Sequence, residues 1–81
     1  MTKIIYSKSS RKTLEIYDKK LALGIIKGIE EIPLGDVKKL EGSKVSILYR
    51  LRIGKYRVIY SYLNEDTIQV IKIDTRGDIY K

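Results

Sequence analysis

Hydrophobic and polar positions along the chain follow three successive patterns, and each pattern predicts one kind of element. Residues 3–6 are rich in Ile and Tyr, which favours a short first strand. Farther along, apolar side chains recur every three or four positions, which indicates helix; they are Leu14, Tyr17, Leu21, Ile25 and Ile29. From residue 45 onward, β-branched and aromatic residues alternate with polar ones, which indicates strands.

Capping residues divide the helical segment into two helices. Ser9 or Ser10 can cap the start of the first helix, and Asp18 can cap the second. Gly24 and Gly28 lie inside the second helix, where glycine costs about 1 kcal/mol relative to alanine. Their spacing of four places them on one face, which predicts close packing of both against a neighbouring element.

A connector and a meander of strands follow the helices. Pro33 and Gly35 end the helical pattern. Residues 34–45 then form a basic connector, in which residues 37–42 can make one helical turn. The expected strands are residues 45–53, 56–63 and 67–73, joined by a Gly54-Lys55 turn and a turn at 64–66, with a tail at 74–81.

Helices followed by consecutive strands are typical of an α+β fold. We therefore expect one domain, residues 1–81, in which an N-terminal strand and a helical hairpin pack on a small twisted antiparallel β-sheet. A chain of this length buries only about 60% of the surface that its unfolded state exposes, so its core must be thin.

The composition excludes several kinds of chemistry. The sequence has no cysteine, which excludes disulfides, thiol catalysis and cysteine metal sites. It has no histidine, so the commonest general base and metal ligand is missing. We expect no metal ion and no cofactor. Since no long apolar stretch occurs, we expect no signal peptide, no membrane partner and a protein of the reducing cytoplasm.

Positive charge is concentrated in one block of the sequence. The chain has a net charge of +7, and residues 38–57 alone contribute +6. The basic residues of this block are Lys38, Lys39, Lys44, Arg50, Arg52, Lys55 and Arg57, against the single acidic residue Glu41. Such a block predicts an anionic partner such as nucleic acid, and a solvated basic surface is the alternative.

The turn at residues 54–55 predicts how the arginines are arranged. A two-residue turn that begins with glycine places Arg52 opposite Arg57, with Arg50 on the same face of the sheet. Like charges directly opposite each other are destabilising, so the cluster favours a phosphate ligand, which Arg binds bidentately. The alternative is that the arginines extend into solvent or pair with acidic residues from elsewhere, of which two are available, Asp74 and Asp78.

Three segments in the second half of the chain form a recognisable set. They are KKLEG at 38–42, YRLRIGKYRVIY at 49–60 and RGDIY at 76–80. In this order they resemble the RelE/ParE superfamily of toxins from toxin–antitoxin systems. The resemblance implies a RelE-like fold and a cognate antitoxin, usually a small acidic protein.

The superfamily has two activities. RelE-type members cut messenger RNA in the ribosomal A site, whereas ParE-type members inhibit DNA gyrase and lack the nuclease residues. Five residues match the RelE-type nucleases by position: Arg50, Arg52, Arg57, Arg76 and Tyr80. The resemblance therefore implies a ribosome-dependent, metal-independent endoribonuclease that inhibits translation. The alternatives are a ParE-type gyrase inhibitor without nuclease activity and an inactive relative.

The matched residues suit attack of a ribose 2′-OH on the adjacent phosphate. Tyr80 is the candidate base, because nearby positive charge favours the tyrosinate form; the alternative is a packing tyrosine. Arg52 and Arg57 would stabilise the phosphorane charge. Arg50 would position the RNA backbone, and Arg76 would converge with the other arginines on one anion-sized site. Because Arg is a very poor proton donor, the resemblance assigns no general acid.

Overall fold

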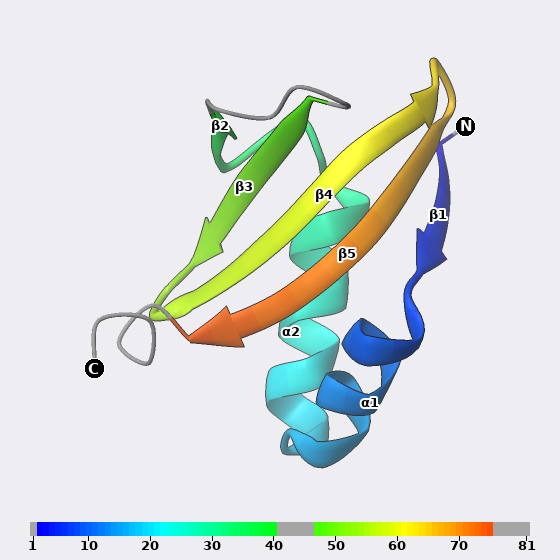
Figure 1. Ribbon diagram of the computed structural model, residues 1–81. Helices are drawn as coiled ribbons and strands as arrows, with labels where there is room; N and C mark the ends of the chain where they lie inside the picture. The colour runs from blue at the N-terminus through cyan, green and yellow to red at the C-terminus, as the bar shows by residue number, and fades with distance from the viewer. Residues whose placement is uncertain (1, 41–46, 76–81) are drawn as a thin grey trace.

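The computed structural model describes residues 2–40 and 47–75, which form a sheet covered on one face by two helices (Figure 1). In these residues the sheet has five strands in the order β1-β5-β4-β3-β2. The elements are β1 (Lys3–Tyr6), α1 (Lys8–Ile16), α2 (Lys19–Glu30), β2 (Asp36–Leu40), β3 (Leu48–Ile53), β4 (Tyr56–Asn64) and β5 (Thr67–Thr75). The α+β class and the helical hairpin on the sheet are confirmed.

The sheet is mixed, not wholly antiparallel as expected. Strands β2 to β5 form the antiparallel meander, but β1 pairs with β5 in parallel, with Ile4 opposite Ile68. The direction of β1 follows from where the chain must go next. Ser7, directly after β1, donates its backbone N–H to the Val70 carbonyl at 2.9 Å, and α1 begins there against β5.

Both helices begin at a side chain that accepts a backbone hydrogen bond. Asp18 caps α2 as predicted, because its Oδ2 accepts from the Lys20 N–H at 3.2 Å. The prediction for α1 was wrong, since the cap is Ser7, whose Oγ accepts from the Ser10 N–H at 3.0 Å. Ser7 also donates its hydroxyl to the Ile71 carbonyl at 2.8 Å, so the cap ties the helix to β5. Ser10 is buried inside the first turn.

The basic connector contains a strand where a helical turn at 37–42 was expected. β2 pairs antiparallel with β3, and Val37 lies opposite Leu51. Val37 is half-buried against the core, so the gain from pairing with the edge of β3 outweighs the local preference for a turn. The remaining connector residues, 41–45, lie outside the described part of the chain, as does residue 46.

The hydrophobic core lies between the helices and the sheet. On the sheet side it is built from alternate strand residues, except that a register shift in the β4–β5 pair between Ile59 and Tyr60 lets Val70 and Ile73 both face the core. Burial of each large side chain contributes about 1.5–3 kcal/mol. The buried members of the cluster are Ile25, Ile29, Ile32, Leu51, Val58, Tyr60, Ile68, Val70 and Ile73.

The two helical glycines differ in what surrounds them. A Cβ added at Gly28 would lie 2.6 Å from the Ile53 Cδ1 atom and 3.9 Å from Leu51, which confirms the predicted close packing there. A Cβ at Gly24 would meet nothing within 4 Å, so the same prediction was wrong for that residue. The face of α2 that carries both glycines therefore touches the sheet at Gly28 and not at Gly24.

We expect Gly24→Ala to stabilise the protein by up to about 1 kcal/mol, because alanine is the better helix former. Gly28→Ala should gain clearly less or lose stability, because Ile53 must leave its rotamer at a cost of about 0.5–1.5 kcal/mol. Urea unfolding of both variants measures the difference. Equal gains at the two positions would contradict the close packing of Gly28 on β3.

Tyr60 is fully buried in the middle of β4 and belongs to an aromatic cluster. Its ring stacks on Tyr49 at 5.4 Å between centroids and meets Tyr62 edge-on at 5.9 Å. Its hydroxyl is buried, and the side chain that can hydrogen-bond it, only weakly, is Tyr62. Burial first, and then the neighbouring Tyr62 and Tyr49, raises the pKa of Tyr60 well above its ordinary value of 10.0.

A raised tyrosine pKa in the folded state makes stability fall with rising pH. The stabilising contribution of neutral Tyr60 is complete below pH 10.0, the ordinary pKa, and is lost as the pH rises above it. Tyr60→Phe should keep or increase stability at pH 7, since it removes a buried hydroxyl that is at best weakly hydrogen-bonded. The free energy of unfolding of Tyr60→Phe should also fall less between pH 7 and pH 11 than that of the wild type. Urea unfolding at pH 7 and pH 11 tests both statements, and an unchanged alkaline loss would contradict them.

Candidate nucleic-acid interface

The predicted arginine cluster lies on the face of the sheet opposite the helices, which we call the outer face. Arg52 is opposite Arg57 and Arg50 is opposite Ile59, so the predicted register is confirmed and the three arginines share this face. Gly54 has a φ of 58°, and no described non-glycine residue has a positive φ. The turn is therefore of the kind that needs a positive φ only at its first position.

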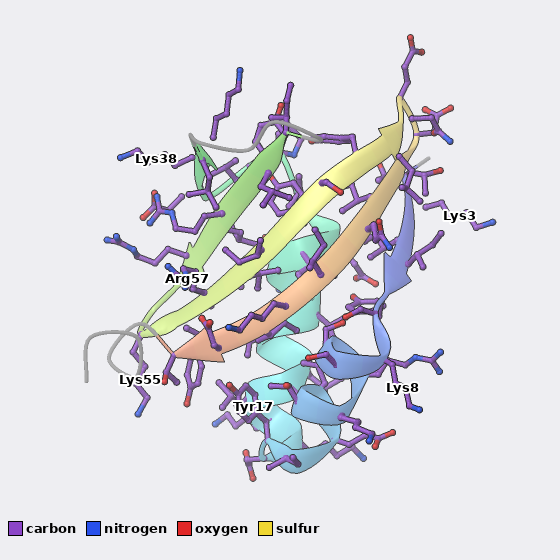
Figure 2. The ribbon with its side chains drawn as sticks, viewed as in Figure 1. Lys3, Lys8, Tyr17, Lys38, Lys55 and Arg57 are labelled. Carbon is purple, nitrogen blue, oxygen red and sulfur yellow. The ribbon has the colours of Figure 1, made fainter. Side chains whose placement is uncertain are left out.

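Charged residues of the outer face form two rows across the four strands of the meander. Figure 2 shows Arg57 over the strands on the side away from the helices, with Lys38 toward β2. From β2 to β5, the first row is Asp36, Arg52, Arg57 and Asp74. The second row is Lys38, Arg50, Ile59 and Lys72. Five cations and two carboxylates therefore share this face, and the central arginine pair has an aspartate on either side.

Asp74 neutralises Arg57 at close range. Its two carboxylate oxygens lie 3.3 Å from the Arg57 Nε and 3.5 Å from the Nη2, and Lys72 Nζ lies 3.4 Å away. The Asp74 side chain is only 15% exposed. The alternative in which an arginine pairs with Asp74 is thus realised in the structure. The second acidic residue suggested as a partner for the arginines, Asp78, lies outside the described residues.

Asp36 contacts the other two arginines and was missed by the sequence reasoning. Its Oδ1 lies 3.5 Å from Arg50 Nη2, and its Oδ2 lies 3.8 Å from Arg52 Nε. The Asp36 side chain is 56% exposed, so these contacts are worth about 0–1 kcal/mol each. The place of Asp36 follows once β2 is recognised as a strand, because the register then sets it opposite Arg52.

Arg50 is a buried cation with few partners. Its side chain is 10% exposed, and its Nε, like that of Arg52, is buried without a hydrogen-bond partner among the described residues. Burying a guanidinium is costly unless its donors are satisfied. The cluster therefore keeps unused donors next to a partly screened positive charge, which is the arrangement that an anionic ligand can complete.

The other predicted phosphate-binding residues do not form one surface. Lys38 lies on the outer face opposite Arg50, but Lys39 is opposite Tyr49 on the face toward the helices, because successive strand residues alternate. Lys55 lies in the hairpin turn (Figure 2), and its Nζ is 5.6 Å from the centre of the Tyr56 ring. Three further predicted residues lie outside the described part of the chain: Lys44, Arg76 and Tyr80.

Residues 2–40 and 47–75 contain no group of three or more acidic side chains that could hold a metal ion. None of their helices is long and apolar enough to cross a membrane.

Comparisons with known proteins agree with this fold. The protein-family model for the ParE toxin of the type II toxin–antitoxin system parDE matches residues 4–80 of this chain. A protein of Methanocaldococcus jannaschii named "Putative toxin RelE1" is 49% identical over 47 residues, which cover 57% of this chain and 50% of that protein. This chain thus matches about half the length of that curated relative.

Three solved structures are similar along nearly the whole chain. A chain of the archaeal RelE–RelB complex from Pyrococcus horikoshii is 33% identical with a TM-score of 0.71, covering 94% of this chain and 96% of that one. A chain of the RelB–RelE complex from Methanococcus jannaschii is 28% identical with a TM-score of 0.72, covering 94% of this chain and 94% of that one. A chain of the RelBE2 complex from Mycobacterium tuberculosis is 19% identical with a TM-score of 0.75, covering 93% and 98%, and this likeness concerns the fold alone.

The family model covers nearly the whole chain, and the hairpin that carries the resemblance has the register expected of it. The chain belongs to the ParE toxin family, within the RelE/ParE superfamily of toxins from type II toxin–antitoxin systems.

Proposed function

We propose that this toxin is a ribosome-dependent endoribonuclease that cuts messenger RNA in the A site without a metal ion. The observation that carries the proposal is the side-by-side placement of Arg52 and Arg57 on the outer face, beside the buried cation Arg50. Guanidinium groups bind phosphate oxygens bidentately, and a preorganised pair stabilises charge that develops on a phosphate.

The chemistry is attack of a ribose 2′-oxygen on the adjacent phosphorus. The new bond joins the 2′-oxygen to phosphorus, the bond to the 5′-oxygen breaks, and a cyclic phosphate and a 5′-hydroxyl result. Arg52 and Arg57 stabilise the phosphorane, and Arg50 holds the backbone. Tyr80 takes the proton of the 2′-OH, and Arg76 stabilises the leaving side. The residue that protonates the 5′-oxygen is left open, because Arg is a very poor acid.

Gyrase inhibition is the second candidate function, and the match to the ParE family model favours it. The two functions require different properties of the outer face. A nuclease needs the arginines to contact phosphate and stabilise a transition state, whereas a binding-only toxin needs the surface alone. A variant that keeps the fold but loses one guanidinium therefore distinguishes them.

The partner proposed for this toxin is a cognate acidic antitoxin. All three similar structures come from complexes whose names pair a RelE with a RelB or describe a toxin with its antitoxin. The sequence adds a reason of its own, because the +6 block at residues 38–57 attracts an acidic chain and speeds its capture.

In a reconstituted translation reaction the wild-type protein should cut messenger RNA at the A site, as seen by primer extension. Arg57→Ala, Arg76→Ala and Tyr80→Phe should each reduce cleavage by about 10²-fold or more, the usual effect of removing one transition-state contact. Lys12→Ala is the matched control, because Lys12 is an exposed cation on α1 and its loss should leave cleavage unchanged.

A parallel supercoiling assay with purified gyrase decides between the two functions. Inhibition of supercoiling without any cleavage of messenger RNA would overturn the nuclease proposal in favour of the ParE-type activity. Circular dichroism of each variant separates loss of activity from loss of fold. This matters for Arg57, because its removal leaves the Asp74 carboxylate paired with Lys72 instead of with both cations.

Capture of the antitoxin should depend strongly on salt. Because screening shortens the range of the field from the basic block, the association rate should fall between 50 mM and 500 mM NaCl, while dissociation changes less. Stopped-flow mixing with the product of the adjacent antitoxin gene measures both rates. An association rate that does not change over this range would mean that the basic block takes no part in capture.

A further inference from the structure

Asp36 contacts two of the three arginines that the proposed function assigns to the RNA phosphate. Its Oδ1 faces Arg50 and its Oδ2 faces Arg52, at 3.5 Å and 3.8 Å. We propose that Asp36 occupies the phosphate position of the substrate-free site, and that an incoming RNA phosphate displaces it. The inference rests on the proposed function, because it identifies a residue of this chain that competes for the same site.

A carboxylate and a phosphodiester offer guanidinium groups the same pattern of contacts. Each presents two oxygens that carry negative charge, and each binds Arg through charge-assisted hydrogen bonds. Asp36 uses one oxygen for each arginine and so spans the gap between their side chains. Since both anions would contact the same guanidinium nitrogens, the carboxylate and a phosphate compete for them.

The two aspartates of the first row differ in how firmly they are held. Asp74 has three contacts between 3.3 Å and 3.5 Å to Arg57 and Lys72, and its side chain is 15% exposed. Asp36 has contacts of 3.5 Å and 3.8 Å, and its side chain is 56% exposed. Asp74 is therefore a fixed part of the sheet, whereas Asp36 is the carboxylate that can leave.

The exchange is favoured by donors that have no hydrogen bond in the substrate-free site. The buried Nε of Arg50 has no hydrogen-bond partner among the described residues, and that of Arg52 lies 3.8 Å from the Asp36 Oδ2, which is too far for a hydrogen bond. A phosphate in the place of the carboxylate brings further oxygens to these donors. Displacement requires no backbone movement, because the pairing of β2 with β3 holds the main chain while the exposed side chain rotates into solvent.

Because Asp36 occupies the site, a ligand must bind the arginines more strongly than this carboxylate does in order to displace it. When no RNA is present, Asp36 partly neutralises the cluster, so Arg50 is not left as a bare buried charge. A phosphate that arrives without other contacts must compete with the tethered carboxylate. A phosphate presented in the correct place by a larger complex does so with the help of every other contact it makes.

The test compares Asp36→Asn with Glu65→Gln, an identical change of charge in the exposed β4–β5 turn. Two probes are used: inorganic phosphate and a short oligonucleotide whose sugars all lack the 2′-OH nucleophile, so that it cannot be cut. Asp36→Asn should bind both about five- to tenfold more tightly than wild type, as expected for removal of an exposed competing pair. Phosphate should also raise the melting temperature of Asp36→Asn more than that of wild type. Glu65→Gln should match wild type, and Asp74→Asn should not gain affinity.

A second measurement needs no variant. In wild-type protein labelled with ¹³C, added phosphate should shift the carboxyl resonance of Asp36 and leave that of Asp74 in place. The proposal is overturned if Asp36→Asn gains no affinity, if Glu65→Gln gains as much, or if the Asp36 resonance does not move.

These readouts are independent of cleavage. Tight probe binding by Asp36→Asn in a protein that never cuts messenger RNA would sink the proposed function and leave this inference standing. Efficient cleavage of messenger RNA by the wild type, with the same probe affinity in Asp36→Asn and wild type, would support the proposed function and overturn this inference.

Discussion

The direct opposition of Arg52 and Arg57 in the middle of the sheet is the constraint around which the rest of the molecule is arranged. Two guanidiniums in facing positions repel, and nothing in the hairpin itself relieves this. The register is held from the other face, where Leu51 lies opposite Val58 and both are buried under the helices. A slip by one residue would expose this apolar pair and bury the charges, so the core enforces the arginine pair.

The neighbouring strands supply the compensation. β5 brings Asp74 next to Arg57, and β2 brings Asp36 next to Arg52, so the row reads negative, positive, positive, negative across the sheet. The second row has no acidic residue and contains Arg50, which reaches across to Asp36. The outer face thus keeps a positive excess while no arginine of the hairpin is without a carboxylate nearby. This partial compensation lets an arginine cluster persist in a domain with a thin core.

Local signals in the sequence were sufficient for the hairpin and insufficient for its surroundings. A glycine-first turn and an alternating pattern fix the register of β3 and β4 with no information from elsewhere. Asp36 could not be placed in this way, because its position depends on β2, whose strand character comes from pairing with β3 and not from its own residues. The parallel direction of β1 and the Ser7 cap also depend on β5, more than sixty residues away in sequence. Gly24 and Gly28 look alike in sequence, and only the path of α2 across the sheet separates them.

The fold does not select between the two activities of the superfamily, since a ParE family model and RelE-containing structures both match the same chain. The distinction must lie in what the outer face does with an anion. A surface that only binds another protein needs complementary charge, and the donors inside its ion pairs can all be satisfied. Here the buried Nε atoms of Arg50 and Arg52 make no hydrogen bond with the described residues, although the Arg52 Nε lies 3.8 Å from an Asp36 oxygen. Such donors cost free energy in the unliganded protein and recover it when an oxygen-rich ligand enters. A phosphate on the outer face would therefore meet donors that the described carboxylates do not satisfy.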